Sequence, residues 1–306
     1  MNKDLLRMEN LSKEDILDIL NLGDQLKYEL KHGIKHHHLE GKTLGMIFEK
    51  SSTRTRVSFE TGMYQLGGYP LFLSSSDLQI GRGEPIQDTA RVLSRYINGI
   101  MIRTFDQSEV ETLAECSTIP IINGLTDDEH PCQVLADLMT IRENKNILDG
   151  LKIAYIGDGN NMAQSLITGC LTVGMNISLA IPQNYMIKDY YINKGNQIAK
   201  NNKLTFEIVN SPKEAIKNAD VVITDVWASM GKEKEVNERM DSFKGYQVNS
   251  ELMSFAKDDA IVLHCLPAHR EEEITGEILE KHSNVIFEEA ENRLHIQKAI
   301  LVNLMK

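Results

Sequence analysis

Residues 43–74 read TLGMIFEKSSTRTRVSFETGMYQLGGYPLFLS, and this stretch decides the fold. It begins with an apolar run at 43–48 that predicts a buried strand, and it ends with a second apolar run at 69–74. Between them, 53–68 is typical of a helix that stops at a pair of glycines. A strand, a helix and a strand in this order indicate two parallel strands joined by a crossover helix.

The same alternation of strand and helix continues to the end of the chain. Further strands are expected at 97–105, 119–126, 151–157, 176–182, 205–210, 220–225, 260–267 and 284–290. Helices are expected at 12–33, 84–96, 107–117, 130–145, 162–174, 193–202, 212–219, 250–256, 276–281 and 293–306. The pattern pauses at the polar segment 145–150, which indicates two domains, 1–148 and 149–291. The predicted fold is α/β, with two doubly wound parallel-sheet domains and the active site in the cleft between them.

Composition narrows the class of protein. The chain has 306 residues, of which 42% are hydrophobic and 25% charged, and its net charge is −11. An acidic chain repels nucleic acid and anionic membranes, so neither is expected as a partner. The first residues lack the character of a signal or transit peptide, and no apolar stretch approaches membrane-spanning length. The four cysteines (Cys116, Cys132, Cys170 and Cys265) form no CxxC motif, which suits a reducing compartment, so we expect a cytoplasmic protein.

A cluster of hydroxyl and guanidinium groups follows the first strand. Ser52, Thr53, Arg54, Thr55 and Arg56 stand where the next helix begins. A helix N-terminus offers unpaired backbone N–H groups, and arginine can bind phosphate oxygens in a bidentate manner. The cluster therefore predicts a phosphate site. A solvated helix start or a kinase substrate sequence are the alternative interpretations.

Two further candidates stand at the ends of later strands. Arg103 ends one apolar strand, and His130 precedes a proline that can open the next helix. Ligands of open α/β sheets bind at the carboxyl ends of strands, so Arg103 fits an anion site and His130 could polarise a carbonyl. Alternatively, Arg103 only marks where the strand leaves the core, and His130 is structural.

No motif requires a metal or an organic cofactor. Gly157 and Gly159 match the start of a dinucleotide fingerprint, but the third glycine is replaced by Met162 and strand 176–182 ends without an acidic residue. The sequence has no P-loop motif. Three adjacent histidines, 36–38, favour a loop, because adjacent side chains do not easily converge on one ion. We therefore expect neither a metal nor a cofactor.

The second domain offers groups that suit an amino acid. Asn160 and Asn161, at a helix start, suit a carboxylate, and Asp225, at a strand end, suits an ammonium group or caps a helix. Cys265 follows an apolar strand. It is interpreted as a structural cysteine, because no His–Asp arrangement nearby marks a nucleophile.

Four motifs together resemble a known family. SSTRTR (51–56), HPCQ (130–133), DVWASMG (225–231) and HCLPAHR (264–270) have the order and spacing of the transcarbamylases. The last two resemble the ornithine branch of this family, and the resemblance extends over the whole chain. It implies transfer of a carbamoyl group from carbamoyl phosphate to the δ-amine of ornithine, giving citrulline and phosphate in arginine metabolism. It also implies a homotrimer, and a C-terminal helix, 292–306, that packs back on the first domain.

The resemblance assigns roles residue by residue. Carbamoyl phosphate would be bound by Ser52, Thr53, Arg54, Thr55, Gln79, Arg103, His130, Gln133, Cys265, Leu266 and Arg293. Ornithine would be bound by Asn161, Asp225, Ser229 and Met230. Arg54, Arg103, His130 and Cys265 would take part in catalysis, whereas Arg56 would be structural. The polar stretch after Met230 is expected to form a mobile loop that closes over ornithine.

Alternative functions remain at this stage. The acceptor could be another amine, such as putrescine, or aspartate. Aspartate would require cationic groups where Asp225 stands, and putrescine lacks the groups that Asn161 and Ser229 would bind. A nicotinamide-dependent dehydrogenase is disfavoured by the incomplete fingerprint. A module that only binds anions would hold carbamoyl phosphate without turning it over.

Overall fold

The computed structural model describes residues 3–80, 83–228 and 236–306. The chain divides into two compact units. Unit 1 comprises Met1–Met139 and Glu291–Lys306, and unit 2 comprises Thr140–Ala290. The last residues of the chain therefore cluster with the first unit. Contacts divide the chain at 139/140, within a helix, whereas the sequence pattern pauses at 145–150.

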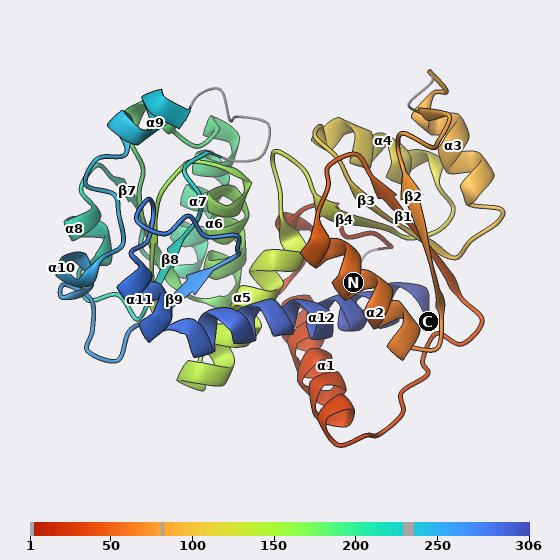
Figure 1. Cartoon of the computed structure of the whole chain (residues 1–306), viewed down its shortest axis with the longest axis horizontal. Helices are drawn as coiled ribbons and strands as arrows, with labels where there is room; N and C mark the ends of the chain where they lie inside the picture. Colours follow the sequence, from red (N-terminus) through yellow and green to blue (C-terminus); the bar gives the residue numbers. More distant parts are fainter. Residues whose placement is uncertain (1–2, 81–82, 229–235) are drawn as a thin grey trace. The chain divides into compact units, whose positions relative to one another are not determined.

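Unit 1 is built on a sheet of four parallel strands (Figure 1). The strands are β1 (Thr43–Phe48), β2 (Tyr69–Ser74), β3 (Gly99–Arg103) and β4 (Ile121–Leu125), in the order β2-β1-β3-β4. Its helices are η1 (Met8–Asn10), α1 (Lys13–Lys31), α2 (Thr53–Gln65), α3 (Ile86–Leu93), α4 (Gln107–Cys116), the first part of α5 (Pro131–Lys145) and the last part of α12 (Ser283–Met305). The parallel strand–helix–strand arrangement predicted for 43–74 is confirmed.

The strand order of unit 1 determines where a ligand can enter. The chain passes from β1 to β2 on one side and later places β3 on the other side of β1. Phe48 and Arg103, the last residues of β1 and β3, are register partners. The connections that leave these two strands therefore diverge, and in open α/β sheets this is the place where ligands bind, at the carboxyl ends of the strands. The register between β3 and β4 shifts at Arg103, and such irregularities commonly lie next to functional sites.

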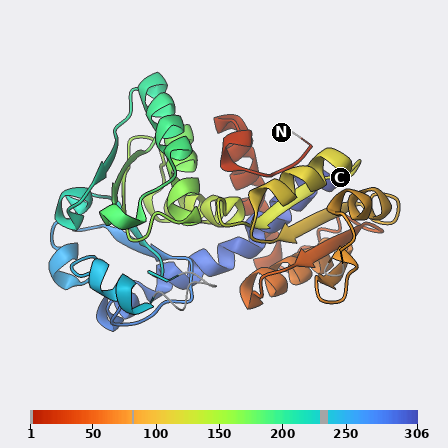
Figure 2. The ribbon, with the colours of Figure 1, turned by 90° about the horizontal axis from the view of Figure 1, so that it is seen from above.

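Unit 2 repeats this architecture with five parallel strands. They are β5 (Lys152–Ile156), β6 (Asn176–Ala180), β7 (Phe206–Val209), β8 (Val221–Thr224) and β9 (Ile261–His264), in the order β7-β6-β5-β8-β9. The helices are α6 (Asn161–Val173), η3 (Gln183–Tyr185), α7 (Asp189–Asn202), α8 (Pro212–Ile216), α9 (Val236–Ser242), α10 (Ser250–Met253) and α11 (Gly276–Lys281). Figure 2 shows the green α6 and α7 on one side of this sheet and the blue helices on the other. The prediction of two parallel α/β domains is confirmed.

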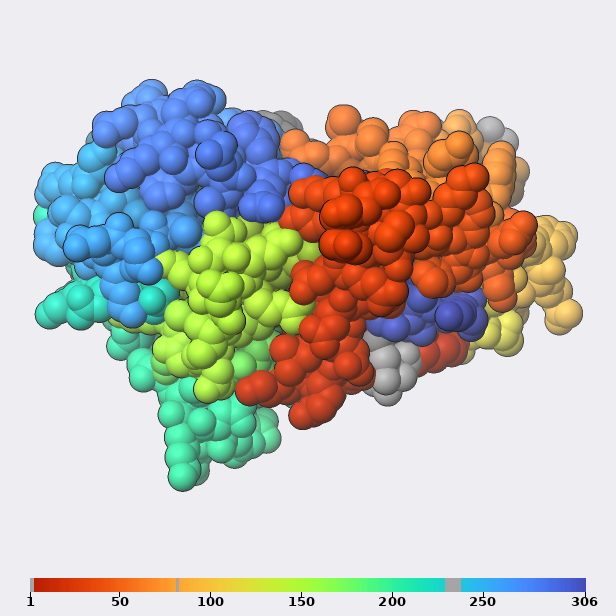
Figure 3. Space-filling model, turned by 90° about the horizontal axis from the view of Figure 1, so that it is seen from below, coloured from red at the N-terminus to blue at the C-terminus, as the bar shows by residue number. Residues whose placement is uncertain are grey.

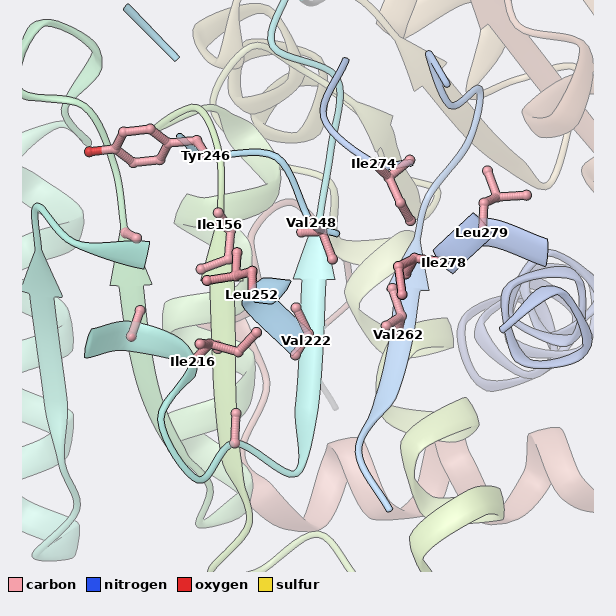
Figure 4. Packing of buried hydrophobic residues seen from close by; sticks show 14 of the residues in the cluster. Ile156, Ile216, Val222, Tyr246, Val248, Leu252, Val262, Ile274, Ile278 and Leu279 are labelled. Carbon is pink, nitrogen blue, oxygen red and sulfur yellow. The ribbon is translucent and has the colours of Figure 1, made fainter. Parts of the chain in front are cut away.

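The core of unit 2 lies between its sheet and the later helices. Ile156, Val222 and Val262 come from three neighbouring strands, and Ile216 and Ile278 come from α8 and α11 (Figure 4). All five side chains are at most 1% exposed. Burying side chains of this size contributes about 1.5–3 kcal/mol each. This packing fixes the direction in which the strand ends point.

One expected strand is wrong. Residues 284–290 belong to α12 (Ser283–Met305), which begins ten residues before the predicted start of the last helix at 293. A short apolar run does not distinguish a strand from a helix. Here the sequence continues with strong helix formers and has no glycine or proline before its end, so the helix extends through it.

The segments that were expected to form loops differ in their structure. Of the polar stretch expected to form a mobile loop, residues 236–242 form α9, whereas 229–235 lie outside the described residues. The three histidines at 36–38 lie in the irregular segment between α1 and β1, as predicted. In the described part of the chain, no helix has the length and hydrophobicity required to cross a membrane.

Candidate active site

The hydroxyl and guanidinium cluster of unit 1 lies at the start of α2. Ser52 caps this helix, because its side-chain oxygen accepts a hydrogen bond from the backbone N–H of Thr55 at 3.2 Å. Thr55 is fully buried, and its hydroxyl accepts a hydrogen bond from the guanidinium of Arg293 at 2.9 Å. Thr53 is exposed and Arg54 is half-buried. The start of α2 therefore combines N–H groups, hydroxyls and arginine, as the sequence predicted.

Three arginines act electrostatically on the buried imidazole of His130. His130 is 5% exposed, and Arg103 and Arg293 are each 4% exposed. Burial, together with the positive charges of Arg293, Arg103 and Arg54, holds the pKa of His130 well below its usual value. The ring is therefore neutral at physiological pH, so it can donate one N–H without adding a further positive charge. Four of the predicted residues are thus brought into one electrostatic cluster.

The remaining predicted residues of unit 1 differ in their placement. Gln133 is fully buried, and its amide donates to Asp137 at 2.8 Å on the same helix. Gln79 is exposed and follows β2 in a bend. Arg56 points to the surface, where it pairs with Glu60 at 3.0 Å and lies over the ring of Phe72. These contacts suit the structural role expected for Arg56.

Asp225 is the centre of the candidate site in unit 2. It follows β8 and is 7% exposed. One carboxylate oxygen accepts from the amide of Asn160 at 2.7 Å, and the other accepts from the thiol of Cys265 at 3.1 Å. Asn160 also caps α6 by accepting from the backbone N–H of Met162 at 3.0 Å. The strand order reverses between β5 and β8, so this contact lies where ligands of open α/β sheets typically bind.

The loop that carries Cys265 is fixed by a buried histidine. The backbone N–H of Leu266 donates to Nδ1 of His264 at 2.9 Å, so Nε2 carries the ring proton and donates to Glu273 at 2.9 Å. Both side chains of this pair are buried. Leu266 has a φ of 56°, which is strained for a branched side chain. This pair therefore holds Cys265 and Leu266 in a defined geometry.

Sequence reasoning missed three polar residues near Asp225. The phenol of Tyr155 is buried and donates to the carbonyl of Asp158 at 2.9 Å. Its pKa is raised well above the usual value by burial and by the charges of Asp225, Asp158 and Cys265. Arg239 is 3% exposed and pairs with the carboxylate of Asp158 at 2.9 Å. A tyrosine near the carboxyl end of an otherwise apolar strand was the available signal.

The structure gives Gly159 a role other than binding a dinucleotide. A Cβ at this position would lie 2.3 Å from the carbonyl oxygen of Tyr185 and 2.7 Å from the backbone nitrogen of Ile187. The backbone N–H of Gly159 also donates to the carbonyl of Tyr185 at 3.0 Å. The glycine therefore allows two backbone segments to approach each other, and a cofactor is not needed to explain it.

The described residues include a group that could coordinate a metal ion. Asp225, His264 and Cys265 each place a ligand atom within 4.8 Å of the others. However, both ring nitrogens of His264 are engaged, one by Leu266 and the other by Glu273. These residues therefore suit a hydrogen-bonded site better than a metal centre.

Two predicted ornithine-binding residues cannot be placed in the same way. Ser229 and Met230 lie outside the described residues. Asn161 is the first residue of α6 and is partly exposed, one residue after the Asn160 that contacts Asp225. Unit 2 thus brings Asn160, Asp225 and Cys265 together, and Asn161 and Leu266 are their chain neighbours.

The fold and these groups define a class of protein. Arginines, hydroxyls and a neutral imidazole at one parallel sheet suit a phosphate and a carbonyl, and the carboxylate of a second sheet suits an amine. This combination is typical of an enzyme that transfers a carbonyl group from a phosphate to an amine.

Comparison with known proteins identifies the family. A family model described as the carbamoyl-P binding domain of aspartate/ornithine carbamoyltransferase matches residues 3–143, and one described as its Asp/Orn binding domain matches 149–304. The ornithine carbamoyltransferase of Anoxybacillus flavithermus is 56% identical over 303 residues, which cover 99% of this chain and 96% of the relative. That of Carboxydothermus hydrogenoformans is 55% identical over 305 residues, which cover 99% and 97%.

Solved structures agree. The ornithine carbamoyltransferase from Pyrococcus furiosus has a TM-score of 0.95 and 49% identity, covering 99% of this chain and 96% of that one. The anabolic enzyme from Campylobacter jejuni has a TM-score of 0.93 and 43% identity, covering 99% of each chain. The chain belongs to the aspartate/ornithine carbamoyltransferase family.

Proposed function

We propose that the protein transfers the carbamoyl group of carbamoyl phosphate to the δ-amine of L-ornithine, giving L-citrulline and phosphate, in arginine metabolism. The observation that carries this proposal is that unit 1 holds a neutral His130 under the charges of three arginines, while unit 2 holds a carboxylate–thiol pair, Asp225 and Cys265. The names of the relatives agree with ornithine as the acceptor.

Unit 1 binds carbamoyl phosphate in this proposal. The phosphate lies at the start of α2, against Ser52, Thr53, Arg54 and Thr55, with Gln79 from the bend after β2. Arg103, His130 and Gln133 hold the carbamoyl group. The N–H of a neutral imidazole and the guanidinium of Arg103 would stabilise the oxyanion, and one such donor is worth about 3 kcal/mol of the barrier.

Unit 2 binds ornithine. Asp225 holds the α-ammonium group, because a buried carboxylate is the natural partner of a cation. Asn161 binds the α-carboxylate, and Ser229 and Met230 complete the pocket. Cys265, Leu266 and Arg293 act at the reacting carbonyl. Positioning both substrates contributes to catalysis as well, since orientation can be worth about 7–11 kcal/mol.

The reaction proceeds by addition and elimination. The neutral δ-amine attacks the carbonyl carbon and forms a carbon–nitrogen bond, and the carbonyl electrons move to oxygen. The carbon–oxygen bond to phosphate then breaks, and the electron pair leaves with phosphate. The amine loses one proton, either to the Cys265–Asp225 pair or to the departing phosphate. The arginines favour departure because negative charge grows on the phosphate oxygens.

The first experiment measures ureido product from carbamoyl phosphate with ornithine, putrescine or aspartate in parallel. Citrulline is expected to form much faster than the other products. Turnover of putrescine or aspartate instead would retain the phosphate site and overturn the ornithine assignment. Asp225→Asn is expected to raise the KM for ornithine, whereas Asp241→Asn, at an exposed Asp–Lys pair, should not.

The assembly and the location are also proposed. A homotrimer is proposed from the resemblance to the transcarbamylases, and Tyr64, Tyr69 and Tyr96 of unit 1, which are 64–75% exposed, are available for contacts between copies. A homotrimer should have a solution mass about three times the chain mass of 34.6 kDa, as light scattering would measure. The monomer mass at working concentration would contradict this. The cytoplasm is the proposed location, as the cysteine usage suggests.

A further inference from the structure

Unit 1 contains a buried chain of polar side chains apart from the candidate active site. Lys298 is fully buried and His36 is 6% exposed. The ammonium of Lys298 lies 3.2 Å from Nε2 of His36 and donates to the amide oxygen of Gln65 at 3.0 Å. Nδ1 of His36 lies 3.2 Å from a carboxylate oxygen of Glu29. These four side chains therefore link α12, the segment before β1, α2 and α1.

The geometry fixes the proton positions in this chain. An ammonium group can only donate, so Nε2 of His36 accepts and the ring proton is on Nδ1, which lies 3.2 Å from Glu29 without hydrogen-bond geometry. Burial lowers the pKa of Lys298 to about 8, and the charge of Glu29 opposes this shift. Burial and the charge of Lys298 also lower the pKa of His36. At neutral pH Lys298 is therefore a cation and His36 a neutral ring.

Burying a lysine is energetically unfavourable unless its ammonium group is paired or hydrogen-bonded. Atoms of residues 3–40, red to orange in Figure 3, form part of the surface, yet His36 is buried. Its neighbour His37 is exposed. Only one of these two adjacent histidines therefore belongs to the buried chain.

The helices that Lys298 joins also carry the phosphate cradle. Arg293, five residues earlier on α12, donates to Thr55 at the start of α2, and Gln65 is the last residue of α2. Between these contacts, a Cβ at Gly62 would lie 3.2 Å from Cγ of Lys298 and 3.4 Å from Cδ1 of Leu294. The two helices therefore approach closely and are tied together at two points.

We propose that Lys298 is a positioning residue for the carbamoyl phosphate site. Its contacts with His36 and Gln65 set the register of α12 against α2, and this register holds Arg293 on Thr55. Since an α-helix is stiff over five residues, a displacement at Lys298 reaches the guanidinium of Arg293. The inference rests on the proposed role of the cradle in binding carbamoyl phosphate.

The test compares steady-state kinetics of full-length variants. Lys298→Met keeps the length of the side chain but removes the charge and the donor. It is expected to raise the KM for carbamoyl phosphate about tenfold, the size of effect typical of losing a hydrogen bond to a charged group, while the KM for ornithine changes less than about twofold. His36→Leu should act in the same direction, and His36→Gln, which keeps an acceptor, should restore most of the affinity. His37→Gln is the matched control and should resemble the wild type.

A double mutant separates positioning from stability. In a Thr55→Val background, Arg293 has already lost its hydroxyl partner, so Lys298→Met should raise the KM for carbamoyl phosphate little further. Full additivity would overturn the proposal, as would a folded Lys298→Met variant with a lower melting temperature but an unchanged KM. If Lys298→Met does not fold, His36→Leu and His36→Gln are compared instead: an equal KM for carbamoyl phosphate in both variants and the wild type would overturn the proposal.

Calorimetric measurement of the Kd for inorganic phosphate tests the positioning role of Lys298 independently of whether the protein forms citrulline. A wild-type protein that binds phosphate but forms no citrulline would contradict the proposed function only. A Kd for phosphate that is weakened in Lys298→Met but not in His37→Gln would still support the positioning role. An equal Kd in both variants and in the wild type would contradict it.

Discussion

At the scale of single residues, His130 owes its chemistry to its surroundings. A histidine in water is partly protonated near neutrality. Here burial and the guanidinium groups of Arg293, Arg103 and Arg54 keep the ring neutral. A neutral N–H donor next to three fixed cations suits an oxygen that becomes negative only during the reaction, because it adds stabilisation at that moment without repelling the arginines.

Replacing His130 should therefore mainly affect the chemical step. His130→Leu, which has no donor, is expected to lower kcat about 100-fold, as the loss of one oxyanion donor does elsewhere. His269→Gln is the control, because the side chain of His269 is exposed and pairs with the nearby Glu272. Measurement of kcat and of both KM values distinguishes a role of His130 in the chemical step from a role in substrate binding. A large rise in KM with unchanged kcat would show that His130 only binds the substrate.

The buried Cys132 and the half-buried Cys265 should respond differently to thiol reagents. Cys132 is fully buried, and burial raises its pKa to about 12, so it has almost no reactive thiolate at neutral pH. Cys265 is half-buried and lies at Asp225 in the candidate site. N-ethylmaleimide is expected to inactivate the enzyme through Cys265. The activity that remains in Cys265→Ser should be insensitive to the reagent, as residual-activity assays would show, and ornithine should slow modification of the wild type.

At the scale of elements, a glycine is required where two backbone segments approach each other closely, as at Gly159. Gly159→Ala would place a methyl group 2.3 Å from a backbone oxygen of Tyr185, and a backbone cannot move as a flexible side chain can. The variant should lose about 1–3 kcal/mol of folding stability, measured by urea unfolding. In Gly276→Ala the nearest atom is a terminal oxygen of Glu271 at 3.2 Å, which can move away. Equal losses in both variants would show that the approach of the backbone at Tyr185 is not the cause.

The elements also show what sequence can and cannot predict. The segment 43–74 was predicted correctly because a strand, a helix and a strand follow one another locally. The prediction of a strand at 284–290 was wrong because a short apolar run fits a strand and a helix equally well. Cys265 was interpreted as structural without its contact to Asp225, 40 residues away, because such contacts depend on the order of strands in the sheet. His36 and Lys298 are 262 residues apart, so no local pattern could pair them.

At the scale of the whole molecule, several histidines are buried in their neutral form, which links stability to acid. Burial and the charge of Lys298 lower the pKa of His295 to about 4, and the pKa of His130 is also lowered. In the unfolded chain these rings bind protons near pH 6.5, whereas in the folded chain they bind protons only at lower pH. Between these values the unfolded state binds more protons, so the free energy of unfolding falls as the pH falls.

His295→Gln should weaken this dependence. It removes the ring that the folded protein keeps neutral, so between pH 7.5 and 5.5 its free energy of unfolding should fall less than that of the wild type. The difference should reach at most about 1.4 kcal/mol per pH unit below 6.5, the limit for one proton. His269→Gln, at an exposed position, should retain the wild-type slope. Urea unfolding at both pH values measures this, and parallel slopes for the wild type and His295→Gln would show that His295 takes no part in acid destabilisation.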